Sequence, residues 1–168
     1  MNYSIVIMGV AGCGKSHIGR PLAASEGWPL IEGDDFHSVE NRRKMSEGIP
    51  LTDADREGWL AQLGQILARA PGPVVLTCSA LKRRYREQLR AASPGLRFVF
   101  LQISRAESLV RVAARASSHF FPVELVDNQF ETLEPPVDEG LTLTLDATLP
   151  VEELQSRIRL WLRPGVCA

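Results

Sequence analysis

Short, continuous apolar runs alternate along the chain with segments in which apolar residues recur every three or four positions. Runs of this length are typical of strands that are buried on both faces of a sheet. We expect five such strands, at Ser4–Met8, Pro29–Glu32, Val74–Cys78, Arg97–Leu101 and Leu141–Leu145.

The segment between the second and third runs has the clearest helical pattern, because its apolar residues follow the spacing of one buried helix face. Thr52-Asp-Ala-Asp55 is typical of a helix start, and Pro71-Gly72 of a helix end. Further helices are expected at Ser16–Ser25, Lys82–Ala92, Glu107–Ala116 and Val151–Leu162. Strands separated by helices predict an α/β fold, with a five-stranded parallel sheet and helices on both faces.

The length and composition narrow the protein class further. A chain of 168 residues without repeats or linkers suits a single domain over residues 1–168. The net charge of −1 gives no reason to expect nucleic acid or a membrane as a partner. The N-terminus has no apolar leader, and Cys13, Cys78 and Cys167 have neither metal-ligand spacing nor the pattern of a disulfide framework. The expected location is the cytoplasm.

One motif follows the first strand directly. Residues 9–16 read Gly-Val-Ala-Gly-Cys-Gly-Lys-Ser, which is a complete phosphate loop. Its glycines allow backbone N–H groups to surround phosphate oxygens, and the following helix directs its positive end at the same anion. The loop predicts a nucleoside triphosphate site and a Mg²⁺ ligand in the Ser16 hydroxyl. The expected binding residues are Gly9, Val10, Ala11, Gly12, Cys13, Gly14, Lys15 and Ser16.

Ligands bind beyond the carboxyl ends of the strands in such a sheet, so the loop after the second strand is the next candidate. Asp34 lies there and is expected to orient or deprotonate an acceptor hydroxyl, or to reach Mg²⁺ through a water. The alternative for Asp34 or Asp35 is a helix N-cap. His37 is expected to bind the acceptor, although a local packing role fits it equally well.

Basic residues gather around the expected acceptor pocket although the net charge is close to zero, which favours an anionic acceptor. A solvated helix face explains most of those in the segment 82–86, and Lys82 is the preferred binding candidate because it is nearest the strand end. The aromatic residues Trp28, Phe36 and Trp59 are expected in the core. The basic set comprises Arg42, Arg43, Lys44, Arg56, Lys82, Arg83, Arg84 and Arg86.

Two further arginines, Arg111 and Arg115, are four residues apart on one expected helix face. They precede a segment that we interpret as a small lid over residues 115–130. A cation delivered by lid closure would stabilise the transferring phosphoryl group. The alternative is a solvated pair.

Several blocks of the chain together resemble the bacterial-type gluconokinases, which are small phosphate-loop kinases. The resemblance covers nearly the whole chain. Besides the phosphate loop it includes Glu32-Gly-Asp-Asp-Phe-His37, Asn41-Arg-Arg-Lys-Met45, Gly48-Ile-Pro-Leu-Thr-Asp-Ala-Asp-Arg56, Cys78-Ser-Ala-Leu-Lys82, His119-Phe120 and Gln129-Phe-Glu-Thr-Leu-Glu-Pro135. The chain departs from the family pattern at Glu32, Ser38, Ser118 and Asn128.

The resemblance implies a three-layer P-loop NTPase fold with a small lid, and ATP-dependent phosphorylation of D-gluconate at its 6-hydroxyl with Mg²⁺. It implies a homodimer as well. By the same resemblance Lys15, Asp34 and Arg115 are the catalytic residues, and Arg111 and Arg115 bind ATP. The implied gluconate-binding residues are Asp34, His37, Lys44, Arg56, Lys82 and His119.

Two other kinds of protein are alternatives to this interpretation. A shikimate, adenylylsulfate or nucleotide kinase would have the same fold, but a nucleotide acceptor needs an aromatic base pocket, which residues 34–56 do not offer. A GTP-dependent switch would need an Asn-Lys-x-Asp segment, and the chain contains none. The sugar-acid kinase is therefore the favoured hypothesis.

Overall fold

The computed structural model describes residues 3–115, 122–163 and 165 of the chain. Most of the segment 115–121, including His119, lies outside the described residues, so the first part of the expected lid is not described.

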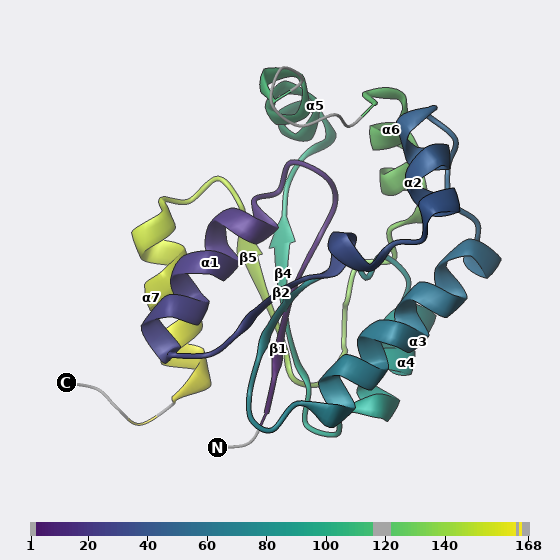
Figure 1. The fold of residues 1–168 in the computed structure, drawn as a ribbon. Helices are drawn as coiled ribbons and strands as arrows, with labels where there is room; N and C mark the ends of the chain where they lie inside the picture. Colours follow the sequence, from purple (N-terminus) through teal and green to yellow (C-terminus); the bar gives the residue numbers. More distant parts are fainter. Residues whose placement is uncertain (1–2, 116–121, 164, 166–168) are drawn as a thin grey trace.

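Five parallel strands form one sheet in the order β2-β3-β1-β4-β5 (Figure 1). Ile5 of β1 pairs with Val75 on one side and with Arg97 on the other, so the first strand lies at the centre. This arrangement confirms the predicted five-stranded parallel sheet. The strands are β1 (Ile5–Met8), β2 (Leu30–Glu32), β3 (Val75–Thr77), β4 (Arg97–Gln102) and β5 (Thr142–Asp146).

Helices cover both faces of the sheet, as predicted, and make three layers. Because successive strand residues point to opposite faces, Ile5 and Ile7 pack in one apolar cluster and Val6 and Met8 in another. The first cluster includes residues of α1 (Lys15–Glu26) and α7 (Val151–Leu162). The second includes residues of α3 (Asp53–Arg69) and α4 (Arg83–Ala92), on the other side of the sheet in Figure 1.

The predicted start of α3 is confirmed by a capping box. The Thr52 hydroxyl accepts a hydrogen bond from the Asp55 N–H at 3.1 Å, and the Asp55 carboxylate accepts one from the Thr52 N–H at 2.9 Å. The helix ends at Arg69, just before Pro71. These reciprocal bonds fix the direction in which the chain enters the helix that carries Arg56 and Trp59.

Four elements lie beyond one end of the sheet, at the carboxyl ends of the strands (Figure 1). They are the 3-10 turn η1 (Gly33–Phe36), α2 (Val39–Ser46), α5 (Arg105–Ala114) and α6 (Glu124–Thr132). Of these, the sequence predicted only α5, which begins two residues earlier than expected because Ser104 caps it. Helix α6 occupies part of the segment that was interpreted as a lid.

Candidate functional site

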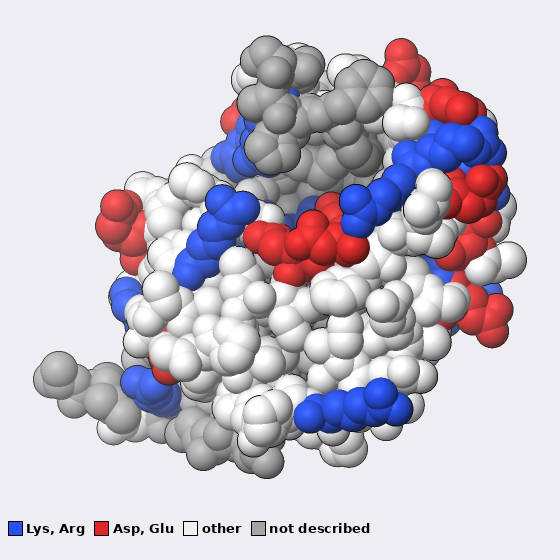
Figure 2. Space-filling view, viewed as in Figure 1, with Lys and Arg blue, Asp and Glu red and all other residues white. Residues whose placement is uncertain are grey.

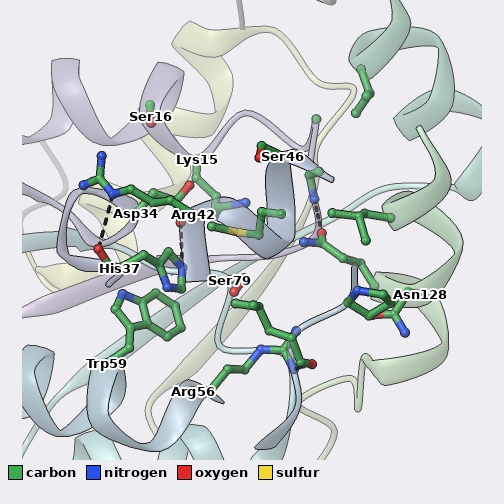
Figure 3. A pocket seen from close by; sticks show the side chains of 18 of the residues that line it. Lys15, Ser16, Asp34, His37, Arg42, Ser46, Arg56, Trp59, Ser79 and Asn128 are labelled. Atoms are coloured by element: carbon green, nitrogen blue, oxygen red, sulfur yellow. Dashed lines mark hydrogen bonds and ion pairs between the residues drawn. The ribbon is translucent and has the colours of Figure 1, made fainter. Parts of the chain in front are cut away.

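A cavity of about 510 Å³ lies where the carboxyl ends of the strands meet these elements, and its volume suits a small ligand. Figure 3 shows Asp34, His37 and Trp59 on one side of it and Asn128 of α6 on the other. On the face of the molecule in Figure 2, acidic side chains lie over the η1 turn between two groups of basic ones. Charged residues of both signs, such as Asp34 and Arg42, also line the cavity.

The phosphate loop forms one wall of the cavity. Gly12 and Gly14 have φ values of 79° and 95°, a left-handed conformation that side chains disfavour. In the described part of the chain, no hydrogen bond engages the backbone N–H groups of Gly12, Gly14, Lys15 or Ser16. Four unpaired N–H groups at the start of α1 constitute an anion site.

The eight expected residues of the loop divide into two groups. Ala11, Gly12, Gly14, Lys15 and Ser16 line the cavity, whereas Gly9, Val10 and Cys13 do not. Val10 and Cys13 are buried in the apolar cluster that includes residues of α1, so their packing anchors the loop to the core. The Lys15 ammonium donates to the carbonyls of Gly9 and Val10 at 3.0 and 3.2 Å, which holds it over the loop.

Glu32, which the sequence analysis noted only as a departure from the family pattern, lies directly beside Ser16. Its Oε2 accepts hydrogen bonds from the hydroxyls of Ser16 at 2.8 Å and Thr77 at 2.5 Å. Its Oε1 is buried without a hydrogen-bond partner, with the Arg20 Nε at 3.5 Å. A hydroxyl beside an unsatisfied carboxylate oxygen is a donor set that suits Mg²⁺, which usually takes few protein ligands in addition to phosphate.

Asp34 is placed by the η1 turn at the cavity wall, with 81% of its side chain exposed. The turn approaches β3 so closely that a Cβ on Gly33 would lie 2.4 Å from the Thr77 carbonyl oxygen. Only glycine fits there, and this approach brings Asp34 over the sheet end. Neither Asp34 nor Asp35 caps a helix: the residue before η1 is Glu32, and Ser38 caps α2.

His37 is buried beneath Asp34 and stacks on the Trp59 ring at 4.1 Å. Its Nε2 lies 3.7 Å from an Asp34 oxygen. Burial lowers the pKa of His37; Asp34 opposes this effect, and Arg56 and Arg42 reinforce it. The imidazole is therefore neutral at neutral pH and is able to donate or accept one hydrogen bond. Trp59 belongs to the core, as predicted, and also lines the cavity.

The lowered pKa of His37 predicts a pH dependence of stability. The folded state binds this proton more weakly than the unfolded state, so stability is fully present above about pH 6.5 and is lost as the pH falls through the folded pKa. We expect His37→Gln to lose less unfolding free energy than the wild type between about pH 7.5 and about pH 5.5. Urea unfolding at each pH measures this, with His17→Gln on the exposed surface of α1 as the control. Equal losses in His37→Gln and the wild type would contradict it.

The basic residues expected around the acceptor do not all reach the cavity. Arg42 and Arg56 line it, and Lys44 and Lys82 do not. Lys44 pairs with Asp55 at 2.9 Å, and Lys82 pairs with Asp53 at 3.0 Å. Both aspartates lie in the first turn of α3, so these carboxylates hold the two lysines away from the cavity wall.

Arg42 and Arg56 are held by backbone carbonyls instead. Arg42 donates to the carbonyls of Asp35 and His37 at 2.6 and 3.2 Å. Arg56 is buried and donates to the Leu51 carbonyl at 2.6 Å. Neither guanidinium has a carboxylate partner within the described residues, so both positive charges are available to a ligand.

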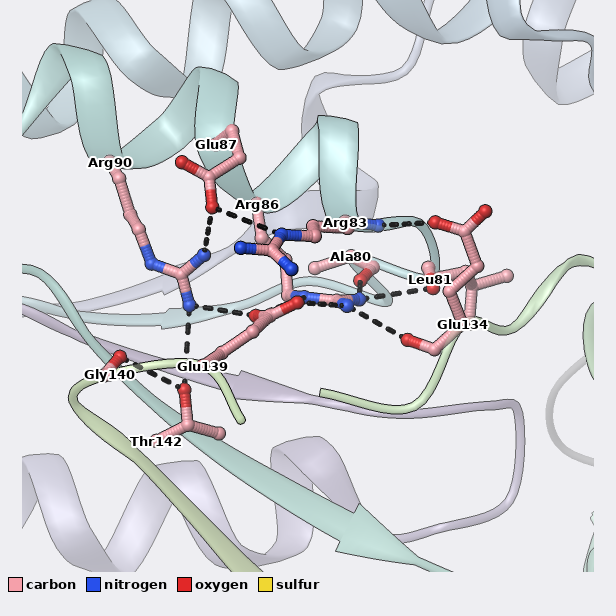
Figure 4. A network of polar contacts seen from close by, with 10 residues as sticks. All are labelled: Ala80, Leu81, Arg83, Arg86, Glu87, Arg90, Glu134, Glu139, Gly140 and Thr142. Carbon is pink, nitrogen blue, oxygen red and sulfur yellow. Dashed lines mark hydrogen bonds and ion pairs between the residues drawn. The ribbon is translucent and has the colours of Figure 1, made fainter. Parts of the chain in front are cut away.

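Arg86, another member of the expected basic set, lies in a separate buried network (Figure 4). It is fully buried and pairs with Glu139 at 2.7 Å. It also donates to the carbonyls of Ala80, Leu81 and Glu134 at 2.8 to 3.1 Å. Burial would raise the pKa of Glu139, but hydrogen bonds from Arg86 and Arg90 outweigh it and hold this pKa below its ordinary value. Arg86 therefore does not line the cavity and stabilises the loop after β3.

Arg111 of α5 and Arg115, which follows the last residue of this helix, have different positions. Arg115, at the end of the helix, lines the cavity. Arg111 does not line it; its guanidinium donates to the carbonyls of Gly12 and Ala147 at 3.3 and 3.2 Å. Arg111 thus connects the phosphate loop to the loop after β5.

Helix α6 provides cavity residues that the sequence analysis did not assign. Leu125, Asn128 and Gln129 line the cavity, and the Gln129 carboxamide oxygen accepts a hydrogen bond from the Ala11 N–H at 2.6 Å. The signal was the block from Gln129 to Pro135, which contributed to the family resemblance without a derived role.

Comparison with known proteins matches residues 5–136 to the AAA domain family. The chain is 46% identical over 138 residues to a gluconokinase of Gluconobacter oxydans, covering 80% of this chain and 77% of the relative. It is 39% identical over 160 residues to the thermosensitive gluconokinase of Escherichia coli, covering 93% and 85%.

Solved structures of kinases are also similar to this chain. A gluconokinase from Sinorhizobium meliloti is 47% identical, with a TM-score of 0.84 over 96% of this chain and 97% of that one. A sugar kinase from Janibacter is 38% identical, with a TM-score of 0.86 over 96% and 95%. The shikimate kinase of Aquifex aeolicus, 19% identical with a TM-score of 0.60 over 95% of each chain, shares the fold. Among the described residues, no helix is long and apolar enough to span a membrane.

Proposed function

This chain belongs to the gluconokinase family of P-loop kinases, and on that premise we propose that it transfers the γ-phosphoryl group of ATP to the 6-hydroxyl of D-gluconate. The products are 6-phospho-D-gluconate and ADP. The observation that carries the proposal is a single cavity whose wall includes the phosphate loop, the Asp34 carboxylate and the guanidinium groups of Arg42 and Arg56.

The donor side of the cavity binds the triphosphate. The unpaired N–H groups of residues 12 and 14–16 hydrogen-bond the phosphate oxygens, and Lys15 and Arg115 neutralise charge that develops on the transferring group. The Ser16 hydroxyl and the Glu32 carboxylate would hold Mg²⁺, because Glu32 has an unsatisfied buried oxygen beside that hydroxyl. The metal supplies further charge neutralisation on the phosphates when it is bound.

The acceptor side of the cavity binds the sugar acid. Arg42 and Arg56 bind the carboxylate, since a guanidinium fits a carboxylate with two parallel hydrogen bonds. Neutral His37 hydrogen-bonds a hydroxyl, and Asp34 orients the 6-hydroxyl or accepts its proton. Lys44 and Lys82 are left out of the pocket because aspartates neutralise them.

Several features stay predictions of the family resemblance. They are a lid over residues 115–130 that delivers Arg115, a role of His119 in binding gluconate, and a homodimer. The cytoplasmic location stays a prediction from the N-terminal sequence and the cysteine pattern. A single domain over residues 1–168 is also a prediction. Light scattering on the purified protein tests the dimer.

An assay of ADP release with ATP and a panel of acceptors tests the proposed reaction. The panel includes gluconate, other sugar acids, shikimate and nucleoside monophosphates. We expect gluconate to give the highest kcat/KM, and NMR of the product to show phosphate on the 6-oxygen. A higher kcat/KM with any other acceptor would overturn the substrate assignment.

Arg56→Ala is expected to raise the KM for gluconate by about tenfold to a hundredfold and to leave the KM for ATP nearly unchanged. The reason is the loss of a charged hydrogen bond, which typically contributes about 1.5–3 kcal/mol. Initial rates with varied gluconate at saturating ATP measure the change. Arg43→Ala is the matched control, because Arg43 lies on α2 and pairs with Glu40 and Glu47 without lining the cavity. An unchanged KM in Arg56→Ala would remove Arg56 from the pocket.

A further inference from the structure

Ala11 is held by side chains from two other helices. Its N–H donates to the Gln129 Oε1 on α6 at 2.6 Å. Its carbonyl accepts a hydrogen bond from the Ser108 hydroxyl on α5 at 2.7 Å. One polar group of each of the two peptide units that flank Ala11 is therefore hydrogen-bonded from outside the phosphate loop.

The engaged residue directly precedes the part of the loop that is free. The N–H groups of Gly12 and Gly14–Ser16 have no hydrogen-bond partner in the described chain, whereas that of Ala11 is occupied. Gly12 follows Ala11 with a φ of 79°, and glycine has a wide range of accessible dihedral angles. A change in dihedral angle at this point would rotate the N–H groups that follow. The two hydrogen bonds that hold the Ala11 backbone limit this rotation.

We propose that Gln129 is a positioning residue for the donor nucleotide: through Ala11 it holds the phosphate loop in the conformation in which its free N–H groups converge on the phosphates. The proposal rests on the proposed kinase function and assigns a role to the block from Gln129 to Pro135. Gln129 acts through the backbone of the loop, with Ser108 as the second support.

Helix α6 is anchored well enough for this role. Just after its C-terminal end, the Glu134 N–H donates to the Leu81 carbonyl at 2.8 Å, and the Glu134 carbonyl accepts from Arg86 at 2.8 Å (Figure 4). The Glu134 carboxylate also accepts a hydrogen bond from the Arg83 N–H at 2.8 Å, at the start of α4. The position of Gln129 is thus fixed relative to the loop after β3 as well as to the phosphate loop.

The chemistry of the side chain gives the proposal a specific prediction. A carboxamide oxygen accepts a hydrogen bond without bringing a negative charge to a site that binds phosphates. Glutamate would keep the acceptor and add the charge, whereas methionine would keep the approximate size and remove the acceptor. The two variants separate the hydrogen bond from the packing.

Titration calorimetry tests the proposal. The ADP titration is made in the absence of acceptor and does not depend on which sugar acid is the substrate, and a separate gluconate titration detects a general structural defect. We expect Gln129→Met to weaken ADP binding by roughly fivefold to tenfold, as for the loss of one hydrogen bond, and gluconate binding by less than about twofold. Gln129→Glu should weaken ADP binding at least as much, and the loss should shrink as salt screens the added charge. Ser108→Ala should weaken ADP binding in the same direction.

Glu131→Gln, on the exposed surface of the same helix, is the matched control and should bind ADP like the wild type. Melting temperatures measured in parallel separate positioning from folding. Wild-type affinity for ADP in Gln129→Met would overturn the proposal. An equal loss of ADP and gluconate affinity with a lowered melting temperature would do the same, because it would indicate a structural role only. If Gln129→Met does not fold, Gln129→Glu and Ser108→Ala decide the question by the same criteria.

Discussion

Replacing Asp34 by asparagine is expected to lower kcat by about a hundredfold to ten-thousandfold, the range that a positioned acid or base contributes. The amide keeps the size of the side chain but cannot accept the proton of the 6-hydroxyl. Since no hydrogen bond joins Asp34 to the phosphate loop in the described part of the chain, the affinity for ADP should change little. Single-turnover rates and ADP titration measure the two quantities.

Asp35→Asn is the matched control, because this neighbour has the same chemistry but does not line the cavity. Its kcat should remain close to that of the wild type. If Asp34→Asn retained the wild-type kcat, Asp34 would be neither a base nor an orienting group. A pH–rate profile distinguishes these two roles: loss of a base removes the acidic limb of the profile, and loss of an orienting group keeps it.

Arg86→Met is expected to lower the free energy of unfolding by about 3–5 kcal/mol, as when one partner of a buried ion pair is removed. The change leaves the buried Glu139 carboxylate with Arg90 as its remaining partner and removes hydrogen bonds to three backbone carbonyls. Ala80 has a φ of 46°, an unfavourable angle for a residue with a Cβ, and its carbonyl is one of the three. Urea unfolding monitored by circular dichroism measures the loss.

Two further variants make this prediction specific. Arg84→Met removes a surface arginine from the same helix and should change stability by less than about 0.5 kcal/mol. The double variant Arg86→Met with Glu139→Leu should be more stable than the sum of the single changes predicts, because both charges are removed together. A loss below about 1 kcal/mol in Arg86→Met would show that the network contributes little to folding.

Sequence patterns predicted the sheet and its covering helices because these elements are determined by continuous apolar runs and by local caps. Each expected strand overlaps an observed one, and the capping residues around Thr52 mark the start of α3 correctly. Helix α2 was missed because Asn41 is its only buried residue, so it has no apolar stripe. Helix α6 was missed because its position depends on long-range contacts such as the hydrogen bond between Gln129 and Ala11.

The phosphate loop and Asp34 were predictable because they follow the first and second strands, whereas the family resemblance assigned the roles of Arg56 and Arg115. The phosphate loop, Asp34, His37, Arg56 and Arg115 reach one cavity. Lys44 and Lys82 do not, because Asp55 and Asp53 bind them, and a pairing between separate elements leaves no signal in spacing. The role of Glu32 was missed for a related reason: its contacts with Ser16 of α1 and Thr77 of β3 arise only when these elements pack beside β2.

The central place of β1 has a consequence for how the protein folds during synthesis. This strand and the loop after it leave the ribosome before the two strands that flank β1 in the sheet, which begin near Val75 and Arg97. Pairing over such distances along the chain slows folding, since long loops must close before the contacts form. The phosphate loop is therefore synthesised early, but the sheet that positions it is completed late. Until the sheet forms, the apolar strand β1 is exposed and can aggregate or bind chaperones.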